Sequence, residues 1–265
     1  MSNLSTTFQT TQSPPVVISR GEQPKPLRVV RVRDWRELER RIGAWKQLLG
    51  RSLWPNPCYS PSFLLPLLKH QHSEQAEILL VESAEDASEP TLLGLAPIIR
   101  SSIYRLPFKT ATIWRPDFTF DGTPLLDKVQ AASALDTLLN SLRHEGYRLL
   151  CFDTTSAEDG FAKLVESRLR DDNLPRFTRT KYQRAALRPT GTFEAYCREK
   201  LSKNRRKKIR RQVERLSKQG QLNFERSANG DDLAPWVSDF RKLEASGWKG
   251  EQKSAILSDD RSITF

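Results

Sequence analysis

The order of β-type and helix-type segments constrains the fold of this 265-residue chain more than any other feature of its sequence. Short runs rich in β-branched and apolar residues, separated by turn residues, predict strands. Such runs occupy residues 27–33, 77–82, 92–100, 103–107 and 111–115. Helical spacing then predicts helices over 129–142 and 161–169, which alternate with a buried strand over 147–152 and a strand over 177–187. This order predicts an α/β fold with a mixed, largely antiparallel sheet flanked by helices.

The order begins again after residue 190. A long basic helix from Thr192, a strand over 221–225 and a helix over 233–246 predict the opening of a second unit, and residues 258–265 resemble the start of a further helix. A helix that stops within its first turns cannot bury a face, so the sequence is expected to be truncated relative to a complete fold. The expected organisation is a disordered tail (1–26), a first unit (27–190) and an incomplete second unit (191–265).

Positive charge is concentrated in one segment. Residues 198–218 contain eleven Lys or Arg and two Glu, a net +9 of the formal +11 of the chain. Charge held on one helix provides a place where an anion can bind, although a solvated helical arm explains the same pattern. Six side chains are the candidate anion-binding residues: Lys203, Arg205, Arg206, Lys207, Arg210 and Arg211. RNA or another anionic polymer is the alternative partner for this segment, whereas the helix lacks the broad apolar face that insertion into a membrane surface requires.

Composition excludes several other classes of protein. The N-terminal segment lacks the apolar core of a secretory signal, and no apolar run approaches the roughly 18–20 residues of a membrane span, so a cytoplasmic location is expected. The cysteines, Cys58, Cys151 and Cys197, are odd in number and far apart, which predicts buried, reduced thiols rather than disulfides or a zinc site. No metal cofactor is expected, because the three histidines show no ligand spacing.

A second distinctive motif is Glu244-Ala-Ser-Gly-Trp-Lys-Gly250. Gly247 is predicted to end the preceding helix, so that a loop presents Trp248, Lys249 and Gly250. These three are candidate substrate-binding residues, with the indole as an apolar platform and the ammonium as an anion contact. A packed tryptophan that follows a helix-capping glycine explains the same residues without any function.

Five motifs in order resemble one bacterial family. They are Trp45 with Asn56-Pro-Cys-Tyr-Ser-Pro-Ser-Phe63, Leu93-Gly-Leu-Ala-Pro97, Asp121-Gly-Thr-Pro-Leu-Leu-Asp127, Leu201-Ser-Lys-Asn-Arg-Arg-Lys-Lys-Ile-Arg-Arg211 and the 244–250 motif. Together they resemble the BioF2-like acyltransferases of the GNAT superfamily, which are related to the FemAB-type aminoacyl transferases and are often described as CelD-like. The resemblance covers residues 27–265 and implies two tandem GNAT-like units, the second of them incomplete here.

The resemblance also implies a reaction. The expected co-substrate is acetyl-CoA or another acyl-CoA. The expected acceptor is an amine or a hydroxyl, and the resemblance points to envelope or cellulose-type exopolysaccharide biosynthesis. GNAT enzymes bind the CoA pyrophosphate at a glycine-containing turn before a helix. That turn is expected beyond this sequence, since the RxxG-like turn at 188–193 has one glycine and loses a donor at Pro189.

Catalytic residues are not assigned by the sequence. Acyl transfer needs a base and donors for the developing oxyanion, and the carboxylates near the motifs are each explained by a helix cap or an exposed position. Asp121 and Asp127 are the candidate substrate-binding residues of the first unit, and Glu244 and Asp239 precede the tryptophan motif. The alternative function is a non-catalytic anion-binding protein that holds RNA or a polyanionic polymer on the basic helix.

Overall fold

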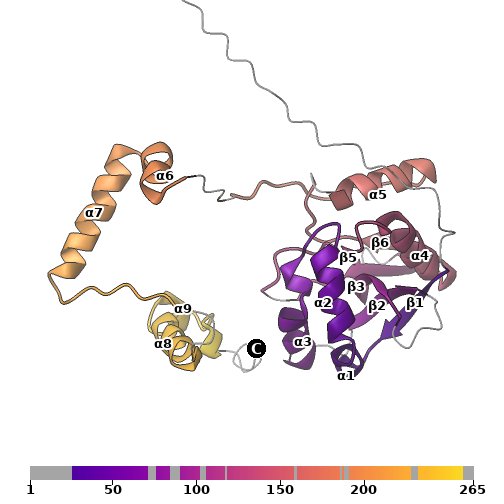
Figure 1. Ribbon diagram of the computed structural model, residues 1–265, viewed down its shortest axis with the longest axis horizontal. Helices are drawn as coiled ribbons and strands as arrows, with labels where there is room; N and C mark the ends of the chain where they lie inside the picture. The colour runs from indigo at the N-terminus through magenta and orange to yellow at the C-terminus, as the bar shows by residue number, and fades with distance from the viewer. Residues whose placement is uncertain are drawn as a thin grey trace, which may run out of the picture. The chain divides into compact units, whose positions relative to one another are not determined.

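The computed structural model of the protein describes residues 26–70, 76–83, 90–101, 106–116, 118–157, 160–185, 187, 191–227 and 232–258 (Figure 1). They divide into two compact units. The described residues of unit 1 end at Asn173, and those of unit 2 begin at Leu174.

Unit 1 is built on one mixed sheet. Its strands are β1 (Leu27–Val32), β2 (Ala76–Ser83), β3 (Leu92–Ser101), β4 (Lys109–Ile113), β5 (Leu125–Leu126) and β6 (Tyr147–Cys151). They are arranged in the order β1-β2-β3-β4-β6, and β5 pairs with β3. Every pairing is antiparallel except that of β4 with β6, which is parallel. The prediction of an α/β fold with a mixed, largely antiparallel sheet is therefore confirmed.

Helices flank this sheet. They are α1 (Trp35–Glu39), α2 (Ile42–Arg51), α3 (Pro61–His70), α4 (Ala131–His144) and α5 (Gly160–Asp171), with a 3₁₀ turn over Pro57–Tyr59. Helix α4 forms the crossover that a parallel pair of strands requires. Its buried residues recur at helical spacing, at Ala131, Ala134, Leu135, Leu138 and Leu142. This apolar stripe packs against β1, β2, β3 and β6, and so ties the antiparallel strands to the parallel one.

The core of unit 1 lies around β2 and β3. Nearly all residues of both strands are buried, including neighbours that point to opposite faces, so the middle of the sheet is covered on both sides. Trp45 of α2 and Tyr59 are fully buried beside them. The Trp45 indole donates to the Tyr59 carbonyl (2.8 Å), and the Tyr59 hydroxyl donates to the Trp114 carbonyl (2.8 Å). These bonds satisfy the polar atoms of two large buried side chains.

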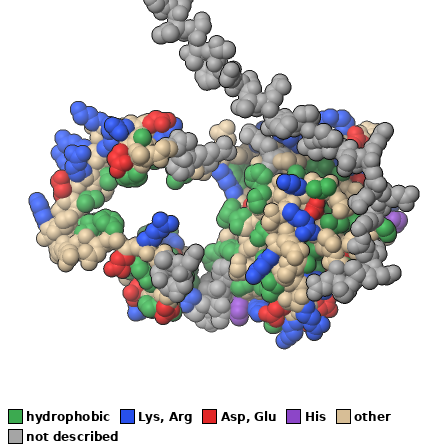
Figure 2. Space-filling view, in the orientation of Figure 1, with side chains coloured by type: hydrophobic (Ala, Val, Ile, Leu, Met, Phe, Trp, Pro, Cys, Tyr) green, Lys and Arg blue, Asp and Glu red, His purple; other side chains and the backbone are tan. Residues whose placement is uncertain are grey.

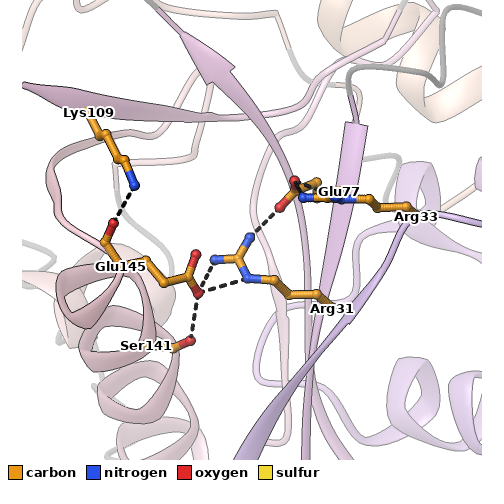
Figure 3. Close-up of polar contacts among 6 residues, drawn as sticks. All are labelled: Arg31, Arg33, Glu77, Lys109, Ser141 and Glu145. Atoms are coloured by element: carbon orange, nitrogen blue, oxygen red, sulfur yellow. Dashed lines mark hydrogen bonds and ion pairs between the residues drawn. The ribbon is translucent and has the colours of Figure 1, made fainter.

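A polar network joins β1, β2, α4 and β4 at one end of the sheet (Figure 3). Arg31 donates through Nε to Glu145 at the end of α4 (2.8 Å) and forms an ion pair with Glu77 of β2. Arg33 also donates to Glu77 (3.0 Å), and Lys109 donates to the Glu145 backbone carbonyl (2.8 Å). Each charged group of the network has a partner of opposite charge or a carbonyl, so we interpret it as structural.

Unit 2 contains helices and no strand among its described residues. These helices are α6 (Phe193–Lys200), α7 (Lys203–Ser217), α8 (Ala234–Ala245) and α9 (Trp248–Glu251), followed by a 3₁₀ turn over Ile256–Ser258. Ala255 is the one buried apolar residue in the described part of this unit. Its helices are thus amphipathic segments that surround no described core.

Two predicted strands are wrong. The described residues of 177–187 and 221–225 belong to no ladder, and Phe177 and Phe224 are 87% and 84% exposed. A β-type run becomes a strand only where a neighbouring strand accepts its backbone hydrogen bonds. The strand predicted as buried at 147–152 is also partly wrong, because β6 ends the sheet order and its residues are half-buried or exposed.

The remaining predictions about segments have mixed outcomes. The single basic helix predicted from Thr192 is two helices, since the chain leaves helical geometry at Leu201 and Ser202. Cys58 is buried as predicted, whereas Cys151 and Cys197 are only partly buried, and none of the three forms a disulfide. Most of the predicted strand at 103–107, the helix start at 258–265 and nearly all of the N-terminal tail lie outside the described residues.

Candidate functional site

Asp121 holds the loop between β4 and β5 against the segment that follows α2. Its two carboxylate oxygens accept from the Trp54 indole (2.9 Å) and from the backbone N–H of Thr123 (2.8 Å). The fully buried Asn56 amide donates to the backbone carbonyls of Asp121 (3.1 Å) and Thr123 (2.9 Å). Asp121 is therefore already committed to hydrogen bonds that fix the loop.

The same loop meets the residues that follow β6. Arg115, just after β4, donates to the Asp153 carboxylate (3.2 Å), and each of the two side chains is about one-third exposed. Gly122 donates to the Thr154 carbonyl (2.9 Å), and a Cβ atom at residue 122 would lie only 2.2 Å from the Asp153 carbonyl oxygen. Glycine is therefore required at this close approach.

This cluster, which comprises Trp54, Arg115, Asp121 and Asp153, is the candidate polar site of unit 1. It lies at the carboxyl ends of the parallel strands β4 and β6, the edge at which α/β sheets commonly bind ligands. The sequence reasoning missed Trp54, Arg115 and Asp153. Their signal is positional, since Arg115 and Asp153 each follow the end of a strand by two residues.

Asp127 has a structural environment. Its Oδ2 atom accepts from Arg51 Nε (2.5 Å), and its Oδ1 atom accepts from the backbone N–H groups of Val129 (2.9 Å) and Gln130 (3.2 Å). The side chain is only 7% exposed. The carboxylate thus holds the turn just before α4, and the structure explains Asp127 as an anchor between α2 and that turn.

The 244–250 motif forms a compact turn of its own, and Trp248, Lys249 and Gly250 lie in helix α9 rather than in the predicted loop. The Glu244 carboxylate pairs with the Lys249 ammonium and accepts from the Ile256 N–H (2.9 Å). The bond from Lys249, followed by that from the backbone N–H, lowers the pKa of Glu244. The Lys249 ammonium therefore already has an anionic partner within the chain.

Glycine at position 250 is required by packing. A Cβ atom there would lie 1.8 Å from the carbonyl oxygen of Ala245, at the end of α8. Trp248 differs from the other motif residues, because its side chain is 63% exposed. The interpretation of Trp248 as a packed tryptophan after a capping glycine does not hold within the described residues, and its exposed indole is the part of the motif left for a ligand.

The basic segment is capped twice. Thr192 Oγ1 accepts from the Ala195 N–H at the start of α6 (3.2 Å), and Ser202 Oγ accepts from the Arg205 N–H at the start of α7 (3.3 Å). The most basic helix, α7, is therefore a separate helix that begins after Ser202, not the middle of one long helix. Lys and Arg side chains gather along α6 and α7 in the space-filling view (Figure 2).

The candidate anion-binding residues lie on α7. Arg206 is half-buried, and the others are exposed: Lys203, Arg205, Lys207, Arg210 and Arg211. No ion pair to these side chains occurs within the described ranges. The structure thus places all six on one helix, where they remain available to an external anion.

The described starts of α4, α6 and α7 do not fit a CoA pyrophosphate as they stand. The turn before α4 is held by the Asp127 carboxylate, whose charge would oppose a phosphate there, and α6 and α7 are capped by Thr192 and Ser202. Gly191 precedes α6 with a positive φ of 77°, but residues 188–190 of that turn lie outside the described ranges. A donor site is therefore not assigned to these helix starts.

Two further searches of the described ranges gave negative results. No helix there is long and apolar enough to cross a bilayer. No group of three or more His, Cys, Asp or Glu side chains in the same ranges is placed to hold a metal ion.

Comparison with solved structures finds distant similarity to acetyltransferases. An aminoglycoside acetyltransferase from an uncultured soil metagenomic sample is 9% identical, with 61% of this chain and 97% of that chain covered and a TM-score of 0.35. A ribosomal-protein-alanine N-acetyltransferase from Brucella melitensis biovar Abortus 2308 is 10% identical, with 61% and 99% covered and a TM-score of 0.38. A GNAT family acetyltransferase from Staphylococcus aureus is 12% identical, with 61% and 98% covered and a TM-score of 0.33.

Sequence comparisons add no closer relative. No family model matches the chain. No curated protein matches it either.

Proposed function

We propose that this chain is part of an acyltransferase that transfers an acyl group from acyl-CoA to an amine or a hydroxyl. The proposal rests on the five motifs that resemble the BioF2-like group and on one structural observation. Unit 1 contains the mixed, largely antiparallel sheet flanked by helices that the resemblance implies. The tandem arrangement, in which residues 191–265 open a second GNAT-like unit, belongs to the same proposal.

The reaction sets requirements that the chain meets only in part. The acceptor nitrogen or oxygen attacks the thioester carbonyl, the tetrahedral intermediate expels CoA thiolate, and a base takes the acceptor proton. In unit 1, the cluster of Trp54, Arg115, Asp121 and Asp153 offers carboxylates to a polar acceptor. In unit 2, the exposed Trp248 offers an apolar surface. We assign neither to proton transfer, because Asp121 and Asp153 already have hydrogen-bond partners within the chain.

Calorimetric titration of the protein with acetyl-CoA tests this function. Saturable binding that changes little between 50 and 300 mM salt, together with release of free CoA in the presence of a primary amine or a sugar hydroxyl, is the expected result. Absence of both binding and CoA release would refute the proposal for this chain. A preference for amino sugars or glucan oligomers over simple amines would support the finer proposal of an envelope or exopolysaccharide acceptor.

A second candidate function is anion binding without catalysis, and the distribution of charge favours it. Residues 1–173 contain 21 Lys or Arg and 21 Asp or Glu, whereas residues 174–265 contain 22 and 11. The whole net charge of +11 therefore lies in the second part of the chain, with α7 at its most basic point. RNA or a polyanionic polymer would be held there by arginine forks and counterion release.

Salt dependence separates the two functions. Binding of an RNA oligomer should weaken steeply with salt, with a log–log slope of several units, if the basic helix holds phosphates. A flat response, or no binding to RNA or heparin, would remove the second candidate and leave the first unaffected.

A further inference from the structure

Helix α7 carries far more positive charge than its own environment neutralises. Eight of its 15 residues are Lys or Arg and one is Glu. Over a helix about 22 Å long, this is close to one cation per 3 Å. No ion pair to these side chains occurs in the described part of the chain, so solvent counterions or a bound anion neutralise them.

The cations also lie at the less favourable end of the helix. Lys203, Arg205 and Arg206 fall in the first turns, where no acidic residue is present. Positive side chains at a helix N-terminus oppose the helix dipole, at about 0.3–1 kcal/mol each. Helix stability therefore does not explain the arrangement, whereas a bound anion would.

The charge forms two matched flanks. Successive residues of a helix are rotated by about 100°. Lys203, Arg206 and Arg210 therefore define one flank, at spacings i, i+3 and i+7. A second flank has the same spacing and is centred about 140° away around the axis; its members are Lys208, Arg211 and Arg215.

Lys207 lies between the two flanks, on the polar side of the helix. A narrow apolar stripe lies on the opposite side. The stripe consists of Ile209, Val213 and Leu216, which are 40%, 39% and 50% exposed. The basic arc thus covers about 200° of the helix surface. A flat anionic surface, such as a lipid bilayer, faces only part of such an arc, whereas a groove with phosphates on both walls faces all of it.

We propose that α7 binds in the groove of double-helical nucleic acid and contacts phosphates on both walls through its two flanks. The major groove of B-form DNA is about 12 Å wide and admits a helix of about 10–12 Å diameter. Five of the eight cations are arginines, whose planar forks suit phosphate oxygens. This contact would recognise the charge and shape of the groove rather than the base sequence, since no base-specific side chain is assigned. The inference rests on the second proposed function and specifies its partner.

Two triple variants of the full chain test the proposal. One is Lys203→Gln with Arg206→Gln and Arg210→Gln, and the other is Lys208→Gln with Arg211→Gln and Arg215→Gln. Glutamine keeps the helix propensity of the residues it replaces. Binding to a fluorescent 20-base-pair DNA duplex is followed by anisotropy from 50 to 300 mM salt. Each variant should lower the slope of log K against log salt by about 2.7, because each removes three phosphate contacts.

A matched control removes three exposed cations of unit 1, by Lys128→Gln, Arg148→Gln and Lys163→Gln, and should keep the wild-type slope. Far-UV circular dichroism confirms that the helices persist in every variant. Loss of slope in one flank variant only would show a one-sided contact and overturn the groove proposal. Tighter binding to phosphatidylglycerol vesicles, to single-stranded RNA or to heparin than to the duplex would also overturn it, while leaving anion binding in place. Binding to none of these would refute both.

Discussion

Replacement of Asp127 by alanine separates a structural role from a substrate-binding role. The carboxylate links three groups, because it accepts from Arg51 Nε and from the N–H groups of Val129 and Gln130, in the turn just before α4. Arg51 Nη2 also donates to the Leu92 carbonyl (2.8 Å), so the pair fastens α2 to β3 and to the start of α4. Asp127→Ala removes all three bonds to the carboxylate while leaving the guanidinium in place.

The expected cost is about 3 kcal/mol. Loss of the acceptor for the two N–H groups in the turn before α4 costs about 1 kcal/mol. Loss of the charge-assisted bond to Arg51 adds about 1.5–3 kcal/mol, and we take the lower part of that range because the Arg51 side chain is 33% exposed. Asp127→Asn keeps an oxygen for the Val129 and Gln130 N–H groups and loses the charge, so about half of the destabilisation is expected.

Urea unfolding followed by tryptophan fluorescence measures the effect, and thermal unfolding should show a fall of roughly 6–12 °C in Tm. Asp171→Ala, which removes a mostly exposed carboxylate 3.9 Å from Arg168, is the control and should change stability by less than about 0.5 kcal/mol. A double-mutant cycle of Asp127→Ala and Arg51→Met should give a coupling energy of about 1 kcal/mol or more.

An unchanged unfolding midpoint for Asp127→Ala would refute this reasoning. If binding of acetyl-CoA or of an acceptor fell at the same time, the interpretation of Asp127 as a substrate-binding residue would replace the structural one. A fall in stability with intact ligand binding at a temperature where the variant is folded would confirm the anchor.

Three further outcomes are expected. Gly250→Ala should lower the protection of α8 and α9 in hydrogen exchange, because its Cβ would overlap the Ala245 carbonyl, and wild-type protection would contradict the packing. Tyr59→Phe should destabilise unit 1 by about 1.5 kcal/mol in urea, since the buried Trp114 carbonyl loses its donor; no change in midpoint would argue against that bond. The pKa of Glu244 is lowered, so the stability it contributes is complete above its usual titration range and is lost as pH falls below about 4. Glu244→Gln should flatten the pH dependence of hydrogen-exchange protection in α8 and α9 between pH 3 and 5. An unchanged pH dependence would show that another group causes it.

The sequence predicted unit 1 well because its pattern and its packing agree. The apolar spacing of 129–142 corresponds to α4 and the run at 92–100 corresponds to β3, each within a few residues. Both segments bury the side chains that produced the pattern. Such agreement between local preference and tertiary burial is what makes a segment predictable.

Unit 2 was harder to predict because local preference there has no packing to support it. The run at 177–187 has strand-like composition, yet Phe177 has no neighbouring strand and is almost fully exposed. The basic helix was predicted as continuous because Leu201 fits its apolar spacing. Ser202, however, supplies a cap that satisfies the Arg205 N–H in an alternative way, and side chains of this kind compete with helix continuation.

In the candidate site, too, local motifs were predictable and long-range contacts were not. Asp121 was named from its motif, but its partner Trp54 lies 67 residues earlier in the chain. The Arg115–Asp153 pair forms only because two parallel strands end at one edge of the sheet. Local sequence patterns do not show which distant residues will be in contact, and strand order cannot be predicted from composition.

The balance of charge links the proposed functions. In unit 1, buried or half-buried carboxylates such as Glu77, Glu82 and Asp127 each form an ion pair with an arginine within the fold. In residues 174–265, cations outnumber carboxylates two to one. Pairing within that part of the chain leaves at least eleven cations unmatched, however its helices pack. The phosphates of a nucleic acid would therefore be drawn to this part of the chain, and competition between CoA and duplex DNA for the protein would show whether an acyl donor also uses α7.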